Sequence, residues 1–355
     1  MDIPERISEA AERAIKEKVF PGCIVAWVRA NGERAVLPFG RLTYDADAPL
    51  VREDTIYDLA SVTKVLPTAT LALMLLDQGR MHLEDKLADY LPEFANSDRE
   101  NVRIKHLLTY SLDGYGLASA IWGDLTSKTA EDVIRTLLTR DFEKRPGTVF
   151  KYTNIPIALL GLALERVFGE PLDVSAEKYL LKPLGMERST FFPETFPKEG
   201  IPPTEIDGWR GLVQGAVHDE SAYVCKRDGK IMGHAGMFSA APDILNFLEM
   251  YLHRGTFGGA RLLSEEIMDL VEKNQIEELG DSMGLGWELN QPRFMGKFSS
   301  SRTFGKTGFT GTLVIVDRER GIAYTILSNR TYPKRPPDGA AINAFRAEIG
   351  EILLA

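Results

Sequence analysis

The sequence predicts an α+β protein in which an antiparallel sheet, flanked by terminal helices, carries an inserted and mostly helical domain. Residues 23–28 and 34–39 are β-rich runs on either side of Asn31-Gly32, which is a strong hairpin signal. Residues 312–317 and 322–327 form a second pair of such runs, and helical periodicity dominates between the two pairs. Strands at both ends with helices between them indicate a sheet domain interrupted by an insertion.

The helices are predicted from the apolar spacing of each segment. One stripe before the first hairpin is formed by Ile7, Ala11, Ala14 and Ile15. Further helices are predicted at residues 63–77, 104–109, 130–139, 155–168, 171–181, 243–251 and 340–354. Pro67 lies early in the first of these and should bend its axis, because proline lacks a backbone donor. Residues 182–209 contain five prolines and are predicted to form a long irregular connection.

A length of 355 residues predicts about two domains. We expect residues 1–80 and 230–355 to form one discontinuous sheet domain, and residues 81–229 to form the inserted helical domain. An active site is then expected in the cleft between the two domains.

The composition excludes several classes of protein. With 44% hydrophobic and 26% charged residues, the chain is that of a folded globular protein, not a disordered or collagen-like one. The 42 basic and 51 acidic side chains give a net charge of −9, so the averaged surface repels phosphate backbones and no nucleic-acid partner is expected. The apolar runs are read as too short to cross a bilayer, so no membrane span is predicted.

A cytoplasmic location is expected on two grounds. The N-terminus begins with a charged helical pattern and has no apolar signal segment. The two cysteines, Cys23 and Cys225, show no C-x-x-C spacing, which is typical of reduced thiols in the cytoplasm.

Ser61-Val62-Thr63-Lys64 is an S-x-x-K tetrapeptide at the start of an apolar helical pattern. Helical spacing places Lys64 on the same face as Ser61, so the amine can take the hydroxyl proton if burial or a nearby cation lowers its pKa. The tetrapeptide alone is weak, because a second copy runs from Ser175 to Lys178 on a segment read as a surface helix. Ser61 could also simply cap the helix that follows.

Two further motifs follow in a fixed order. Tyr152-Thr153-Asn154 precedes a predicted helix, and Lys306-Thr307-Gly308 precedes a predicted strand. S-x-x-K, then Tyr or Ser with Asn two residues later, then K-T-G is the signature set of serine β-lactamases and penicillin-binding proteins. The sequence resembles that superfamily. Tyr152 in place of serine resembles its class C-like branch, which includes family VIII esterases, D-amino-acid peptidases and D-alanyl-D-alanine carboxypeptidases.

The resemblance extends over nearly the whole chain. It rests on residues 20–22, 58–64, 104–109, 150–154, 183–186, 284–287 and 305–311. Residues 217–222 and 233–239 resemble a sub-branch that includes a muramyl-peptide amidase and a low-molecular-weight penicillin-binding protein. Members of the superfamily usually have a short Ser-Gly turn here, but this chain has the residues from Tyr110 to Gly116 instead. This loop is expected to border the pocket, so the difference is expected to affect substrate preference.

The resemblance implies the roles of the catalytic residues. Ser61 would be the acylated nucleophile, Lys64 its proton partner, and Tyr152 a second base or acid that serves the leaving group. The backbone N–H groups of Ser61 and Phe309 would form the oxyanion hole.

The resemblance also implies the substrate-binding residues. Lys306, with Thr307 and Gly308, would hold the substrate's carboxylate or other polar end, and Lys306 would also lower the pKa of Tyr152. Asn154 would bind a substrate amide and hold Lys64 in place.

Two rival motifs carry less weight. His218, Asp219, Glu220 and His234 could be read as metal ligands, but no H-E-x-x-H or cysteine pair accompanies them, so they are expected to organise a loop by hydrogen bonding, with His234 near the active-site rim. Residues 280–284 match the G-x-S-x-G pattern around Ser282, but every histidine precedes Ser282, which is the wrong order for such a triad. Neither a metal nor a cofactor is expected.

The predicted function is a serine hydrolase that forms an acyl-enzyme with a small-molecule or peptide substrate, most consistent with an intracellular esterase or amidase. One alternative is a β-lactamase or D-alanyl-D-alanine carboxypeptidase, and in either case a β-lactam would form a covalent adduct at Ser61. Another alternative is a non-catalytic penicillin-binding or sensing module, which the loss of a motif residue would mark. No motif residue is lost.

Overall fold

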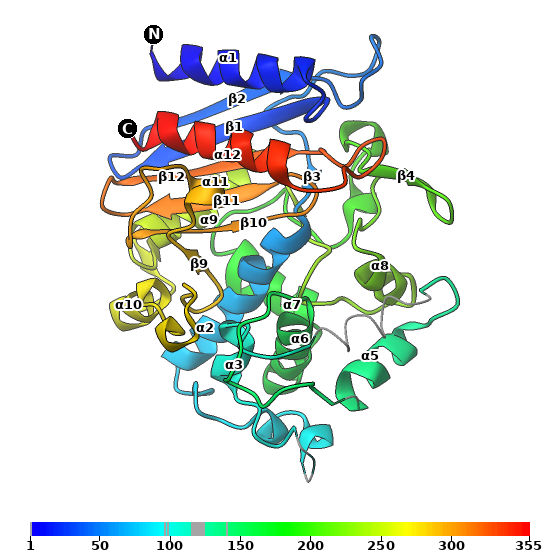
Figure 1. The fold of residues 1–355 in the computed structure, drawn as a ribbon, viewed down its shortest axis with the longest axis vertical. Coiled ribbons are helices and arrows are strands. Elements are labelled where there is room, and N and C mark those ends of the chain that lie inside the picture. Colours follow the sequence, from blue (N-terminus) through cyan, green and yellow to red (C-terminus); the bar gives the residue numbers. More distant parts are fainter. Residues whose placement is uncertain (1, 96, 98, 115–124, 140) are drawn as a thin grey trace.

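The computed structural model describes residues 2–95, 97, 99–114, 125–139 and 141–355. Its largest sheet is six-stranded and antiparallel, in the order β2-β1-β12-β11-β10-β9 (Figure 1). Its strands are β1 (Gly22–Arg29), β2 (Arg34–Gly40), β9 (Glu288–Leu289), β10 (Thr303–Thr307), β11 (Leu313–Asp317) and β12 (Ile322–Ser328). Strands β1 and β12, from opposite ends of the chain, lie side by side. The predicted α+β class is confirmed.

The remaining elements are mostly helices. The helices are α1 (Ile3–Lys16), α2 (Thr70–Asp77), α3 (Ile104–Leu108), α5 (Ala130–Thr139), α6 (Ile155–Phe168), α7 (Leu172–Ala176), α8 (Glu220–Arg227), α9 (Ala241–Leu252), α10 (Glu265–Glu272), α11 (Pro292–Met295) and α12 (Ala340–Leu353). The two-stranded ribbons pair β3 (Tyr57–Asp58) with β6 (Phe238–Ser239), β4 (Glu205–Asp207) with β5 (Gly211–Val213), and β7 (Thr256–Phe257) with β8 (Ala260–Arg261). The domain boundaries expected after residues 80 and 229 stay a prediction.

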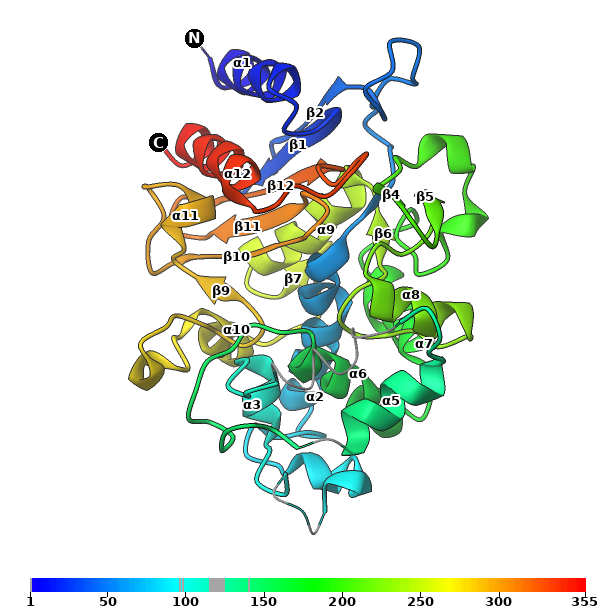
Figure 2. The ribbon, with the colours of Figure 1, turned by 45° about the vertical axis from the view of Figure 1, so that its right-hand side comes forward.

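Helices cover both faces of the six-stranded sheet. The terminal helices α1 and α12 lie together on one face, where Val25 and Ile326 pack against them (Figures 1 and 2). Helix α9 covers the opposite face, where Ile24 and Leu327 belong to the core shared with α2, α3 and α6. Successive residues of a strand point to opposite faces, so residues 23–28 are apolar throughout because both faces are buried.

Local signals near the N-terminus produce the expected elements. The Asp2 side chain accepts a hydrogen bond from the Glu5 N–H, which caps α1. Gly32 adopts a φ of +88° in the turn between β1 and β2, a conformation that glycine reaches without strain. The buried stripe of α1 differs from the predicted one at two positions: Ala10 is buried, and Ile15 is only partly buried.

The segment that carries Ser61 departs from the helix predicted for residues 63–77 by more than the bend expected at Pro67. Residues Ala60–Lys64 form a 3₁₀ turn, Val65–Ala69 form a wider turn, and the regular helix α2 starts at Thr70. Leu66 has a φ of −115° and a ψ of 104°, because the following Pro67 excludes the helical conformation and offers no N–H to the helix. Side chains three residues apart eclipse each other in a 3₁₀ turn, which places Lys64 against Ser61.

The segment Ala60–Asp77 is longer and more apolar than the sequence analysis allowed. Within the described residues, Ala60–Asp77 is long and apolar enough to cross a bilayer by length and composition alone, so the statement that the apolar runs are too short is wrong for this one. Of this window, 83% is buried inside the protein.

The packing between the sheet and α12 generates a stability prediction. Ile326→Ala should lower the free energy of unfolding by about 2–5 kcal/mol, because a buried side chain is replaced by a cavity. Equilibrium urea unfolding followed by circular dichroism measures the change. The matched control is Ile206→Ala on β4, whose side chain is 53% exposed and whose loss should change the value by less than about 0.5 kcal/mol. Equal losses in the two variants would contradict the assignment of Ile326 to the core.

Candidate active site

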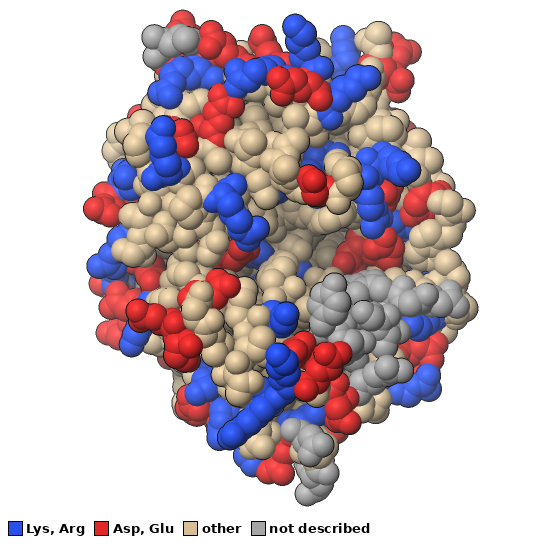
Figure 3. Space-filling model, viewed as in Figure 1, with Lys and Arg blue, Asp and Glu red and all other residues tan. Residues whose placement is uncertain are grey.

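A cleft of about 680 Å³ lies beside Ser61. Figure 3 shows a hollow near the middle of the molecular face, with acidic side chains along part of its border. The cleft is lined by Ala60, Ser61, Leu125, Thr126, Tyr152, Asn154, Trp209, His218, Asp219, Glu220, Ala235, Phe309 and Arg335. Residues from several separate parts of the chain therefore meet at one opening. Trp209 comes from the predicted irregular connection, where it sits between β4 and β5.

Lys64 is placed to exchange a proton with Ser61. Its Nζ lies 2.7 Å from Ser61 Oγ and also donates to the carbonyl of His234 at 3.1 Å. The side chain is fully buried, and this burial lowers the pKa of Lys64 below its ordinary value, with the charge of Lys306 acting in the same direction. A lysine with a lowered pKa reaches its neutral form more readily and can then accept the Ser61 proton.

Tyr152 lies between the two lysines and the cleft. The Nζ atoms of Lys306 and Lys64 lie 4.0 Å and 5.5 Å from the centroid of its ring. Desolvation alone would raise the pKa of Tyr152, but Lys306 and then Lys64 outweigh it, so the pKa of the phenol is held below its ordinary value. The phenol is therefore suited to give and take protons beside Ser61.

Tyr110 supports the ring of Tyr152. The two ring centroids lie 5.1 Å apart, and Tyr110 is fully buried with a φ of +55°. Tyr110 is the first residue of the loop that the sequence analysis expects to border the pocket. Tyr115 and Gly116, at the other end of that loop, lie outside the described residues.

Lys306 forms an ion pair with Glu288, a carboxylate that the sequence analysis did not identify. Its Nζ donates to Glu288 Oε1 at 2.5 Å, and Arg293 donates to Glu288 Oε2 at 2.9 Å. Burial would lower the pKa of Lys306, but Glu288 and Tyr152 outweigh it and raise that pKa. Glu288 directly follows residues 284–287, and in the sheet it pairs with Gly305 of β10. An acidic residue in a buried strand was the sequence signal that could have identified Glu288 as the partner of Lys306.

Among the K-T-G residues, Lys306 and Gly308 are buried and Thr307 is partly exposed. Lys306 is 1% exposed, and Lys306, Thr307 and Gly308 are absent from the described lining of the cleft. A Cβ at position 308 would overlap both Thr312 Oγ1 and the carbonyl of Leu59, so only glycine permits this close approach.

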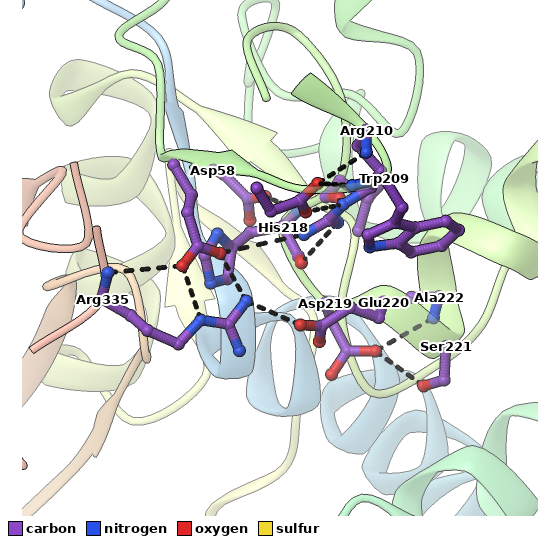
Figure 4. Close-up of polar contacts among 12 residues, drawn as sticks. Asp58, Trp209, Arg210, His218, Asp219, Glu220, Ser221, Ala222 and Arg335 are labelled. Carbon is purple, nitrogen blue, oxygen red and sulfur yellow. Dashed lines mark hydrogen bonds and ion pairs between the residues drawn. The ribbon is translucent and has the colours of Figure 1, made fainter. Parts of the chain in front are cut away.

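Asn154 is held by Asp219, a contact that the sequence did not reveal. Its Nδ2 donates to Asp219 Oδ2 at 2.9 Å, and no hydrogen bond joins Asn154 to Lys64 in the described part of the chain. Asp219 also accepts from Ser221 Oγ at 2.6 Å and from the Ala222 N–H at 3.0 Å at the start of α8 (Figure 4). Burial would raise the pKa of Asp219, but His234, 3.2 Å away, and these donors hold it far below its ordinary value.

The wall beyond Asp219 is an ion-pair network. Arg335 donates to Glu220 at 2.6 Å and to Glu205 Oε1 at 2.7 Å (Figure 4). His218 is buried with its ring 5.5 Å from that of Phe309, and burial lowers the pKa of His218 to about 4, so it is neutral at pH 7. The described residues contain no group of three or more His, Cys, Asp and Glu placed to hold a metal ion.

The predicted oxyanion residues belong to two segments that are tied together. Phe309 lies in the turn between β10 and β11, and its side chain is exposed at the cleft. Thr310 Oγ1 donates to the carbonyl of Asp58 at 2.8 Å, and Thr312 Oγ1 donates to the carbonyl of Leu59 at 2.9 Å. These bonds fix the turn against the residues that lead into Ser61.

The second S-x-x-K copy shows no comparable arrangement. Ser175 is fully buried on the inner face of α7, although this helix lies at the surface with Val174 exposed, and its Oγ donates to Glu170 at 3.2 Å. Lys178 pairs with the same carboxylate at 3.6 Å. Context, not the tetrapeptide, therefore distinguishes Ser61.

The fold and the grouping of Ser61, Lys64, Tyr152 and Lys306 define a serine hydrolase built on the S-x-x-K and K-T-G motifs. The chain belongs to the Beta-lactamase family, with a match that covers residues 8–348. The resemblance to the serine β-lactamase and penicillin-binding-protein superfamily is thereby confirmed, and the chain is an enzyme of this family. Assignment to the class C-like branch stays a prediction.

Proteins similar to this chain carry different names. The chain is 31% identical over 334 residues to a provisionally assigned D-alanyl-D-alanine carboxypeptidase of Escherichia coli K12, with 85% of this chain and 74% of that protein covered. It is 25% identical to an octameric penicillin-binding protein homologue from Pyrococcus abyssi, with a TM-score of 0.72 over 97% of this chain and 76% of that one. EstCE1, a hydrolase with promiscuous acyltransferase activity, shares the fold at a TM-score of 0.77 and 23% identity, with coverages of 99% and 98%.

The contacts of Lys64 and Tyr152 generate a prediction on catalysis. Lys64→Ala and Tyr152→Phe should each reduce kcat by two or more orders of magnitude, because each removes a group that transfers protons to or from the reacting atoms. Steady-state kinetics with an activated ester measures both. A mild effect of Lys64→Ala would mean that another group deprotonates Ser61.

The Glu288 carboxylate generates a prediction on pH dependence. Its negative charge raises the pKa of both Lys306 and Tyr152, so Glu288→Gln should lower both. The alkaline limb of the kcat/KM profile should then move to lower pH, because Lys306 and Tyr152, which must carry its proton to protonate the leaving group, both lose their protons at lower pH. Glu272→Gln is the matched control, because Glu272 is a buried carboxylate that pairs with Arg302 and Arg318 instead. A Glu288→Gln profile that coincides with wild type, or moves to higher pH, contradicts this account.

Proposed function

We propose that this enzyme hydrolyses a carboxylic ester or amide of a small-molecule or peptide substrate through an acyl-enzyme on Ser61. The observation that carries the proposal is the 2.7 Å contact between Ser61 Oγ and the buried amine of Lys64 at the edge of a cleft of about 680 Å³. A cytoplasmic location is part of the proposal. The fact that Cys23 and Cys225 are both unpaired supports it.

The proposed reaction uses each group once in each half. Ser61 Oγ attacks the substrate carbonyl and transfers its proton to neutral Lys64, while the N–H groups of Ser61 and Phe309 stabilise the oxyanion. Tyr152 protonates the leaving alcohol or amine as the tetrahedral intermediate collapses. A water molecule then gives a proton to the Tyr152 phenolate and attacks the acyl-enzyme. As the second tetrahedral intermediate collapses, protonated Lys64 returns its proton to Ser61 Oγ, which releases the acid and restores both Ser61 and neutral Lys64.

The charges around the cleft favour a neutral substrate. Lys306 is buried and paired with Glu288, and Arg335, which lines the cleft, is paired with Glu220 and Glu205. The described lining therefore offers no unpaired cation to a substrate carboxylate. An esterase or amidase that acts on uncharged groups fits this arrangement better than an enzyme that must bind a free C-terminal carboxylate.

A second candidate function is a D-alanyl-D-alanine carboxypeptidase. The name of the E. coli relative at 31% identity supports it. In that case a β-lactam would acylate Ser61, because the same nucleophile would attack the lactam carbonyl. A non-catalytic sensing module is less well supported, because the nucleophile, its base and the tyrosine are all in contact.

Covalent labelling tests the nucleophile. Intact-mass spectrometry after treatment with a fluorophosphonate should show one adduct on wild type and none on Ser61→Ala. Ser282→Ala is the matched control and should label like wild type, because Ser282 belongs to the rejected G-x-S-x-G pattern. Absence of an adduct on wild type, or its persistence in Ser61→Ala, defeats the proposal.

A substrate panel separates the two candidate functions. The panel comprises p-nitrophenyl esters, D-alanine dipeptides, muramyl peptides and nitrocefin. Turnover of neutral esters or amides with little activity on free-carboxylate dipeptides supports the proposal, and the opposite ranking supports the carboxypeptidase.

A further inference from the structure

Arg346 is a buried cation behind the turn that carries Phe309. It lies on α12, it is 4% exposed, and no described carboxylate forms an ion pair with it. Its Nη2 donates to the carbonyls of Gly308 at 2.8 Å and Thr312 at 2.7 Å, and its Nη1 donates to Asn343 at 2.8 Å. A buried guanidinium without an acidic partner is costly, so its placement calls for a reason.

The carbonyl that Arg346 contacts is part of the peptide whose N–H belongs to Phe309. Gly308 O also accepts from the Gly311 N–H at 3.1 Å, so two donors converge on this oxygen. On the other side of the same peptide, the Phe309 N–H donates to no acceptor among the described residues. A charged donor on a carbonyl polarises the peptide and makes its N–H a stronger donor.

We propose that Arg346 positions and polarises the Phe309 N–H so that it stabilises the oxyanion of the tetrahedral intermediate. This inference rests on the proposed function, in which that N–H is an oxyanion donor. Arg346 does not touch the substrate and acts through the Gly308–Phe309 peptide, so it is a positioning residue.

The experiment must distinguish an effect of Arg346 on the Phe309 N–H from a purely structural role of Arg346. Arg346 also holds α12 to the turn, and its loss could simply loosen the helix. Arg320 ties the other end of α12 to the sheet, because its Nε donates to Leu354 O at 2.8 Å and its Nη1 pairs with Asp317 at 3.0 Å. Arg320→Gln therefore weakens the attachment of the helix without touching the Phe309 turn.

The test compares Arg346→Gln, Arg346→Lys and Arg320→Gln with wild type in the full chain. Each is assayed for kcat and KM on a p-nitrophenyl ester, for inhibition by an arylboronic acid that forms an anionic tetrahedral adduct, and for thermal unfolding. Arg346→Gln should lower kcat/KM about tenfold and weaken boronic-acid binding by a similar factor, with little change in KM, because a weakened oxyanion donor acts mainly on the transition state. Arg346→Lys, which retains the charge and one bond, should fall between.

Arg320→Gln is the control that distinguishes an effect on the oxyanion donor from a general loss of stability. Arg320→Gln should lower the unfolding temperature and leave kcat/KM and boronic-acid binding at wild-type values. If Arg346→Gln keeps wild-type values for both, or if Arg320→Gln loses as much as Arg346→Gln, the inference is wrong. If Arg346→Gln does not fold, the same comparison between Arg346→Lys and Arg320→Gln decides. A wild-type enzyme without ester turnover or boronic-acid binding instead overturns the proposed function.

Discussion

The active site depends on one buried carboxylate, that of Asp58. Its Oδ1 accepts from the Ala60 N–H at 2.8 Å and its Oδ2 accepts from the His218 N–H at 2.7 Å, so it joins the residue before the nucleophile to the cleft wall. Ala60 has a φ of +46°, a conformation that residues other than glycine rarely adopt and that surrounding contacts must enforce. The Asp58 carbonyl also accepts from Thr310, which brings the K-T-G turn to the same place. Burial raises the pKa of Asp58 to about 6, although both N–H donors oppose that shift.

Around this anchor, the chemistry is set by buried charges of alternating sign. Glu288 keeps Lys306 charged, Lys306 lowers the pKa of Tyr152, and both Lys306 and burial lower the pKa of Lys64. The charge of Glu288 therefore acts on Lys306, and the charge of Lys306 acts in turn on Tyr152 and Lys64. Such a chain lowers the pKa of both the amine and the phenol that lie beside Ser61. This arrangement buries the charged side chains of Lys64, Glu288 and Lys306, which costs free energy of folding.

Local signals predicted much of the fold. The hairpin at Asn31-Gly32, the antiparallel pairs at the two ends and the helix at Ile155–Phe168 follow from turn residues and apolar spacing. The predicted helix at residues 63–77 was wrong in its first half, because periodicity reports which face is buried and does not report the break that Pro67 imposes. The two lysines and the tyrosine were found through their motifs, but Glu288 and the contact of Asp219 with Asn154 were not.

What the sequence by itself determined is the set of reacting groups, because Ser61 and Lys64 are three residues apart and local geometry alone brings them into contact. Only the tertiary structure decided which groups control them. Lys306 meets Glu288 across 18 positions, Arg346 meets Gly308 across 38, and Asn154 meets Asp219 across 65. The physical reason is that pKa values and hydrogen-bond donor strength depend on distance and burial in space, and neither follows from position along the chain until the sheet and helices have packed.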